Sequence, residues 1–199
     1  MRTRIIVPAL SFVLLAGVVG CGSESTATDT SASAESPSGS DAAITLNDAD
    51  IVFAQGMIAH HEQAIEMAEF ALDPAAGAGE AVIDLATRIS QAQDGEIDLM
   101  TSWLTAAGES ITMDMSDGHD MSSMDGMMSA DEMDELAAAT GADFDRMWLE
   151  MMIAHHEGAI SQSEDVVADG SNAEVIALAQ QIITAQQGEI DEMRALLGG

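Results

Sequence analysis

Two nearly identical nine-residue stretches decide the fold of this 199-residue chain: MIAHHEQAI at residues 57–65 and MIAHHEGAI at residues 152–160. A second matching pair follows them, AQDGEID at residues 92–98 and AQQGEID at residues 185–191. Such self-similarity indicates that one structural unit occurs twice. Each unit contains two amphipathic segments joined by a turn, which is the pattern of an αα-hairpin. Two duplicated hairpins predict an all-α fold, a four-helix bundle.

The periodicity of the apolar side chains locates the expected helices. They cover residues 47–72, 80–106, 143–168 and 172–197, with a short additional helix near residues 130–139. Suitable N-cap residues, whose side chains accept hydrogen bonds from free backbone N–H groups, are Asn47 or Asp48, Asp143, and Ser171 or Asn172. The bundle domain is expected to comprise a first hairpin (residues 47–106), a linker (107–129) and a second hairpin (130–199).

Ionisable residues interrupt the apolar faces at matching positions in the two repeats. A helical wheel at about 100° per residue places His61 near the centre of the apolar face of its helix, with His60 and Glu62 on the flanks. His156 lies at the centre of the same face in the second repeat. The second helix of each hairpin carries a glutamate within its apolar stripe, Glu96 and Glu189. Each hairpin is thus predicted to direct one histidine and one glutamate toward the bundle axis.

Burial of four ionisable groups is costly unless each has a compensating partner. Two interpretations follow. In the first, packing of the two hairpins brings the histidines and glutamates together around a metal ion. In the second, buried His–Glu hydrogen bonds hold the helices in register. The candidate metal ligands are Met57, His60, His61, Glu62 and Glu96 in the first repeat, and Met152, His155, His156, Glu157 and Glu189 in the second.

The two Met-Ile-x-His-His-x-x-Ala-Ile motifs, each followed by Gln-x-x-Glu-Ile, resemble the bacterial family called domain of unknown function 305. The resemblance covers roughly residues 47–197. It implies a ferritin-like four-helix bundle, and it implies copper binding and copper resistance outside the cytoplasm, in which some members take part. Residues 100–104 (MTSWL) fit the family's pattern at the end of the second helix, whereas residues 193–197 (MRALL) lack the tryptophan.

The linker is rich in methionine, with six in the 16 residues from Met113 to Met128 and no apolar periodicity. Thioether sulfur is a soft ligand that suits Cu(I), and unlike a thiol it forms no disulfides. The candidate copper ligands here are Met113, Met115, His119, Met121, Met124, Met127 and Met128. The alternative is an acidic low-complexity linker whose methionines bind nothing or serve as oxidation sinks. The helical methionines are expected to fill the core or its flanks: Met67, Met100, Met147, Met151 and Met193.

The N-terminus is typical of an export signal. Residues 1–20 contain Arg2 and Arg4 and then an apolar run that is short for a membrane span. Small residues before Cys21 resemble the bacterial lipobox, which predicts lipidation of Cys21 and anchoring to the outer face of the cell membrane. An ordinary secretory signal is the alternative. Residues 21–46 are rich in small and polar side chains, so a flexible tether is expected. With a single cysteine, no disulfide can form within the chain.

Charge excludes one large class of function. The chain has 35 acidic residues against five basic ones, a net charge of −30, and it contains no lysine. Cleavage before Cys21 would leave three basic residues and a net charge of −32. Binding to nucleic acid is therefore not expected, since it needs clustered cations.

The predicted function is that of a copper-binding lipoprotein, which buffers copper or hands it on. A copper-handling protein is one candidate partner, and association into a homo-oligomer is the other. Two alternatives remain: a ferritin-like di-metal oxidase, and a metal-free interaction bundle of the cell envelope. Di-metal oxidases use Glu-x-x-His on two helices, a motif that neither repeat contains. Because no nucleophile or nucleotide-binding motif is present either, the protein is not expected to be an enzyme.

Overall fold

The computed structural model describes residues 44–113 and 124–198, which form five helices and no strand. The helices are α1 (Asp48–Leu72), α2 (Glu80–Ala107), α3 (Ala130–Ala138), α4 (Gly141–Asp169) and α5 (Ala173–Leu197). The all-α bundle is confirmed, and all but one of the helix starts lie within a residue of their expected positions. The predicted signal peptide, Cys21 and the linker residues Met115, His119 and Met121 lie outside the described residues.

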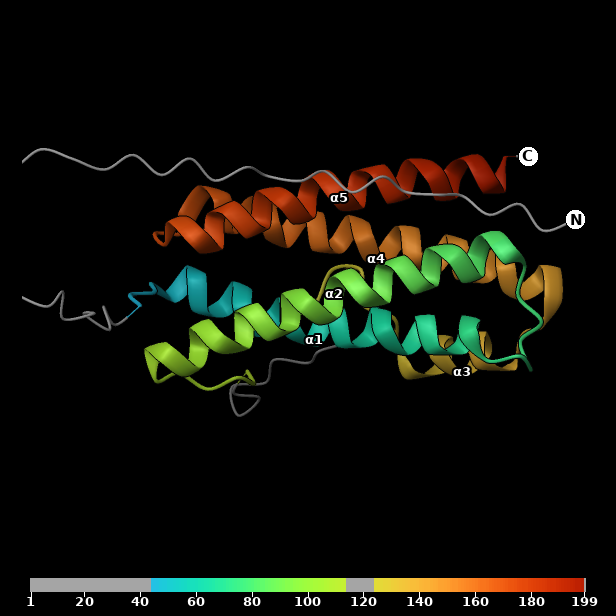
Figure 1. Ribbon diagram of the computed structural model, residues 1–199, viewed down its shortest axis with the longest axis horizontal. Coiled ribbons are helices and arrows are strands. Elements are labelled where there is room, and N and C mark those ends of the chain that lie inside the picture. The colour runs from blue at the N-terminus through green and yellow to red at the C-terminus, as the bar shows by residue number, and fades with distance from the viewer. Residues whose placement is uncertain (1–43, 114–123, 199) are drawn as a thin grey trace, which may run out of the picture. The chain divides into compact units, whose positions relative to one another are not determined.

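The four long helices pack as two hairpins. α1 lies along α2 and α4 lies along α5, while α1 and α4 contact each other and join the hairpins (Figure 1). The short helix α3 packs against both α1 and α4. The core is rich in methionine, as expected: Met67, Met100 and Met193 are fully buried. Within the described residues, no helix is both long and apolar enough to cross a membrane.

Side-chain caps begin α1 and α5 as expected. Asn47 and Asp50 form a capping box at the start of α1, and Asn172 accepts from two backbone N–H groups at the start of α5. The predicted cap at Asp143 is wrong, because α4 begins two residues earlier at Gly141. There the backbone N–H of Gly141 donates to the carbonyl of Ala76 at 2.7 Å. A tertiary contact therefore anchors this helix end in place of a side-chain cap.

Two aspartates at equivalent positions of the repeats interlock the hairpins. The carboxylate of Asp50, near the start of α1, accepts from the backbone N–H groups of Ser171 and Asn172 in the α4–α5 turn. Its counterpart Asp145, near the start of α4, accepts at 2.9 Å from the N–H of Gly79 in the α1–α2 turn. Each helix therefore begins where the other ends. This antiparallel register brings the middle of α1 opposite the middle of α4.

The residues just before α1 belong to the bundle. Ile44 and Leu46 pack against an apolar core cluster that includes Phe53. The carbonyl of Thr45 accepts from the side-chain amide of Asn172 at 3.1 Å. Residues 44–46 are therefore held by tertiary contacts, although they were expected to be the end of the tether over residues 21–46.

Candidate metal centre

Four histidines meet where α1 and α4 cross. His60, His61, His155 and His156 are all fully buried. The central positions of His61 and His156 were expected, and His60, expected on the flank of the apolar face, is fully buried as well. Because α1 packs against α2 on one side and α4 on another, its buried arc is wider than one apolar stripe. Adjacent residues, about 100° apart on the helix, are both enclosed.

His60 and His155 contact each other across the two hairpins. Their ring centroids are 3.7 Å apart and the ring planes are inclined by 45°. Neither nitrogen of either ring has a hydrogen-bond partner within the described residues. Buried polar atoms almost always have partners, so this pair is an exception in need of an explanation.

His61 and His156 pair with the glutamates of their own hairpins. The Nε2 atom of His61 lies 2.7 Å from Oε2 of Glu96, and the same distance separates His156 from Glu189. A carboxylate accepts, so Nε2 of each ring donates to it, and in a neutral imidazole with this tautomer Nδ1 presents a lone pair. Both Nδ1 atoms are buried without a partner in the described part of the chain. The glutamates thus act first as hydrogen-bond acceptors that fix the tautomer of each histidine.

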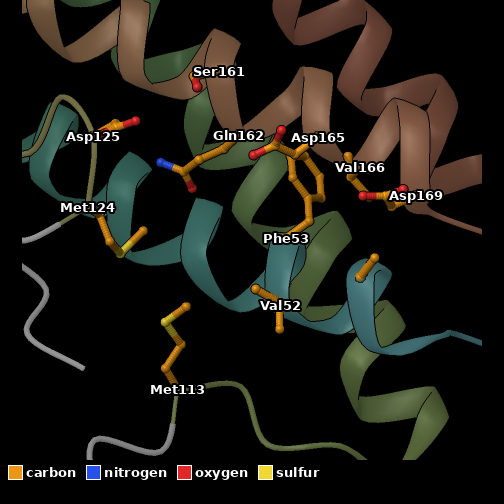
Figure 2. Close-up of a pocket in the computed structure, with 11 residues that line it drawn as sticks. Val52, Phe53, Met113, Met124, Asp125, Ser161, Gln162, Asp165, Val166 and Asp169 are labelled. Carbon is orange, nitrogen blue, oxygen red and sulfur yellow. The ribbon is translucent and has the colours of Figure 1, made fainter. Parts of the chain in front are cut away.

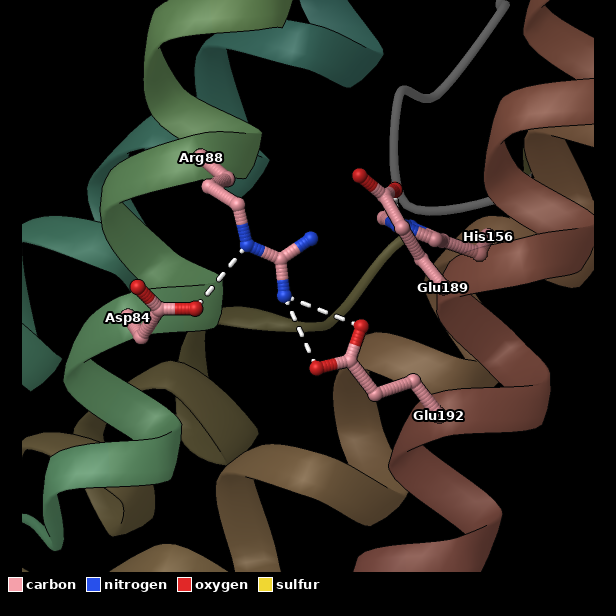
Figure 3. A network of polar contacts seen from close by, with 5 residues as sticks. All are labelled: Asp84, Arg88, His156, Glu189 and Glu192. Carbon is pink, nitrogen blue, oxygen red and sulfur yellow. Dashed lines mark hydrogen bonds and ion pairs between the residues drawn. The ribbon is translucent and has the colours of Figure 1, made fainter.

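An ion-pair network links α2 to α5 beside these pairs. The guanidinium of Arg88 donates to both carboxylate oxygens of Glu192 at 2.9 Å and to Asp84 at 3.0 Å. Figure 3 shows Arg88 reaching from α2 to Glu192, about one turn after Glu189 on α5. The pairs are close to half exposed, so their contribution to stability is small. They connect α2 to α5 beside the His156–Glu189 pair (Figure 3).

The surroundings keep two of the histidines neutral. Burial, assisted by repulsion from His61, lowers the pKa of His60 to about 3. The backbone of Asp125 lies near the ring and acts in the opposite direction, raising the pKa of His60. No hydrogen bond from this backbone to the ring has normal geometry. Burial and then the neighbouring His60 also lower the pKa of His155 well below its usual value. At neutral pH both imidazoles are therefore in the form that binds metal ions.

The donor set fits a copper ion, but the rings are not arranged around one. Six ring nitrogens of the four histidines are buried without partners among the described residues, and imidazole is a good copper ligand. Yet within residues 44–113 and 124–198, no three His, Cys, Asp or Glu side chains converge tightly enough to hold a metal ion. The rings of His60 and His155, which contact each other at a tilt of 45°, would have to turn to direct their lone pairs at one point.

The remaining helical candidates do not join the histidines equally. Met57 and Met152 are fully buried in the core, one turn before the histidines. Glu62 and Glu157 are exposed, and the carboxylate of Glu157 accepts from Arg194 on α5 at 2.6 Å. The two predicted glutamate ligands at positions 62 and 157 thus lie on the surface, because each is on the side of its helix that faces away from the contact between α1 and α4.

The ends of the linker meet at a groove between α1 and α4. A Cβ atom added to Gly56 would lie 3.2 Å from the methyl carbon of Met124 and 3.4 Å from that of Met113. Figure 2 shows both methionines beside α1, with Gln162 of α4 across the groove. The groove has a volume of about 390 Å³. Two predicted thioether ligands that are far apart in the sequence are therefore close in space.

The other described linker residues are partly covered. Met127 and Met128 are half-buried, and Met128 packs against the core cluster around α1 and α4. Sequence reasoning missed Gln63, whose side-chain amide donates to the carbonyl of Met128 and accepts from its N–H. The sequence did contain a sign that Gln63 is special, because the two nine-residue motifs differ only at Gln63 and its counterpart Gly158.

These features define a class of protein: a duplicated antiparallel helical bundle with a His-His pair buried in the first helix of each hairpin. Residues 50–197 match the family model described as "Domain of unknown function (DUF305)". The chain belongs to the DUF305 family. No curated protein matches the sequence.

Solved structures resemble this bundle. A DUF305 fragment from Deinococcus radiodurans is 30% identical, with a TM-score of 0.68 over 76% of this chain and 97% of its own. A DUF305 protein from Streptomyces coelicolor, described as a candidate secreted protein, is 29% identical, with a TM-score of 0.68 over 75% of this chain and 92% of its own. CopM in its Cu(II)-bound form is 30% identical, with a TM-score of 0.62 over 74% and 94% of the respective chains.

Proposed function

We propose that this protein is an exported, lipid-anchored copper-binding protein, and that copper binds at the histidine cluster of His60, His61, His155 and His156. The observation that carries the proposal is the set of six buried ring nitrogens that have no hydrogen-bond partner among the described residues. An unsatisfied buried polar atom costs on the order of 1–3 kcal/mol, so this set is best explained by a ligand that the nitrogens bind.

Similarity to CopM supports copper as the ion. CopM has been solved with Cu(II) and with Cu(I) bound, at 30% and 27% identity to this chain. Neutral imidazole suits copper, and thioether suits Cu(I). The methionine-rich linker, with Met113 and Met124 at its described ends, is proposed as the first point of capture. The net charge of −30 raises the local concentration of cations around the bundle.

Glu96 and Glu189 are proposed to position the ligands, by holding His61 and His156 in the tautomer that presents Nδ1. A carboxylate bonded to a ligating histidine fixes its ring and raises its basicity. This role accounts for the glutamates without requiring them to bind the ion. The two interpretations of the sequence, a metal site and buried His–Glu hydrogen bonds, are then both correct, because the hydrogen bonds orient the histidines that bind the metal ion.

Copper titration of the purified protein tests the proposal. A competition against a Cu(I) chelator should show binding that is lost when His60 and His155 are both replaced by Gln. Glu96→Gln should weaken Cu(I) binding by roughly 10- to 100-fold, and the imidazole ¹⁵N shifts should report a changed tautomer of His61. The matched control is Glu62→Gln on the exposed face of α1, which should change neither.

Two outcomes would contradict the site. Binding that survives loss of the histidines but disappears with Met113, Met124 and Met128 would place copper in the linker alone. Identical melting temperatures with and without copper would support the metal-free bundle, because a ligand that binds only the native state must stabilise it. We propose binding rather than catalysis; oxygen consumption dependent on bound metal and lost in Glu96→Gln would revive the oxidase.

Export and anchoring are proposed from the N-terminal sequence, with the secreted class given for the relative from Streptomyces coelicolor as support. Labelling of cells with a palmitate analogue should mark the wild type and not Cys21→Ser. Recovery of the labelled wild type in the membrane fraction is the expected result. A wild-type chain that is released unlabelled would favour the ordinary secretory signal.

A further inference from the structure

A short stretch of the linker lies directly on α4 beside the histidine cluster. We name Met124–Met128 the strap. A Cβ atom added to Gly158 of α4 would lie 2.0 Å from the carbonyl oxygen of Asp125 and 2.7 Å from Cα of Gly126. Gly126 itself has a φ of +82°. Gly126 of the strap thus packs against Gly158 of α4. The two backbones are so close that any side chain at position 158 would clash with the strap.

The other side of the strap is clamped to α1. The side-chain amide of Gln63 donates to the carbonyl of Met128 at 2.8 Å and accepts from its N–H at 2.7 Å. Gln63 and Gly158 are equivalent positions of the two repeats. The two repeats have therefore diverged where the strap crosses them. Gln63 on α1 binds the strap, and Gly158 on α4 leaves space for it.

The strap covers the histidines that bridge the hairpins. A Cβ atom on Gly126 would lie 2.9 Å from the backbone carbonyl of His155, and the backbone of Asp125 lies beside the ring of His60. On another side the cluster borders Glu96 and Glu189 through the His61–Glu96 and His156–Glu189 pairs, and these glutamate side chains are 23% and 18% exposed.

Opening between the helices would break the core as a whole. Lifting the strap breaks the two hydrogen bonds of Met128, the packing of its side chain against the core cluster, and the close contact with Gly158. Local openings of this kind need the least free energy in a folded protein.

We propose that the strap is a gate, and that a metal ion reaches or leaves His60 and His155 when the strap lifts from Gly158 and Gln63. The proposal rests on the proposed function for its metal ion, but closure of the cluster by the strap can be measured without metal. Because Gln63 and Gly158, which hold the strap, do not contact the ring nitrogens, loosening the strap should change the rates of uptake and release more than the affinity.

Carbethoxylation of histidine by diethyl pyrocarbonate, followed peptide by peptide in the metal-free protein, measures access to His60 and His155. Gln63→Leu removes both hydrogen bonds to Met128 and should speed modification by roughly 10- to 100-fold. Gly158→Ala displaces the strap and should do the same. The matched control is Gln55→Leu, which removes the hydrogen bond to the carbonyl of Ser110 at the other end of the linker and should leave the rate unchanged.

Cu(I) transfer from a coloured chelator then measures the gate with metal. Gln63→Leu should speed uptake and release by similar factors and change affinity by less than about threefold, because the two neutral hydrogen bonds it removes are not made to the ion. Unchanged carbethoxylation and transfer rates in folded Gln63→Leu and Gly158→Ala proteins would overturn the gate. If the wild type binds no Cu(I), the proposed function fails, while carbethoxylation still decides whether the strap closes the cluster.

Discussion

Adjacent histidines in each repeat have different surroundings although both are buried. His61 donates from Nε2 to Glu96, whereas the ring of His60 contacts that of His155 at a tilt and has no hydrogen-bond partner in the described residues. The first arrangement fixes a tautomer, and the second leaves two nitrogens of each ring free. We infer that His61 and His156 are held in a single tautomer, while His60 and His155 are the rings that must turn to bind an ion.

Acid should destabilise the metal-free protein between about pH 6.5 and pH 3. The pKa of His60 is about 3 in the folded protein, against the ordinary value of 6.5, and that of His155 is also well below 6.5. Between these limits the unfolded chain binds protons that the folded protein excludes. Stability should therefore fall as the pH falls, by up to about 1.4 kcal/mol per pH unit for each histidine, and neither should contribute above pH 6.5.

Urea unfolding at pH 7, 6 and 5 measures this pH dependence. His60→Leu combined with His155→Leu should flatten it, since leucine is neutral in both states. An equally steep dependence in this variant would contradict the assignment to His60 and His155. The measurements stop at pH 5, because many carboxylates become protonated at lower pH. Their protonation relieves charge repulsion and would change the stability for a second reason.

At the scale of helices and turns, the reciprocal contacts of Asp50 and Asp145 align the hairpins. Each aspartate is near the start of one hairpin and binds backbone N–H groups in the turn of the other. Asp50 is fully buried and also closes the capping box of α1. The first helix of each repeat was predictable from periodicity, but the pairing of an aspartate with a turn about 120 or 66 residues away in sequence was not.

Loss of the two aspartates should have unequal costs. Asp50→Ala removes the acceptor of part-buried hydrogen bonds from the N–H groups of Ser171, Asn172 and Asn47, and it should lower the free energy of unfolding by about 2–4 kcal/mol. Asp145→Ala removes one half-buried contact to Gly79 and should cost about 1 kcal/mol. Chemical denaturation measures both. The exposed Asp143→Ala is the control, and equal losses for Asp50 and Asp145 would contradict this account.

For the whole molecule, charge is the dominant long-range term. The chain carries a net charge of −30, and Arg88, Arg146 and Arg194 are each already paired with a carboxylate. The remaining acidic residues repel one another in the compact state. This repulsion destabilises the bundle but attracts cations to it.

Raising NaCl from 10 to 500 mM should therefore stabilise the metal-free protein, because salt screens the repulsion over about 10 Å or less. An increase in Tm of about 4–8 °C is expected for a gain of roughly 2 kcal/mol in a protein of this size. Differential scanning calorimetry measures the change. KCl should give the same curve, which excludes a specific Na⁺ site. A Tm that falls with salt would show that the ion pairs outweigh the repulsion.

The sequence by itself determined the helices, their duplication and the burial of His61 and His156, because periodicity and self-similarity are local properties of the chain. Only the tertiary structure decided that the ring of His60 contacts that of His155, that Glu62 and Glu157 stay on the surface, and that the strap crosses at Gly158. These features depend on the register between α1 and α4 and on backbone contacts between distant segments. Local periodicity carries no information about either one.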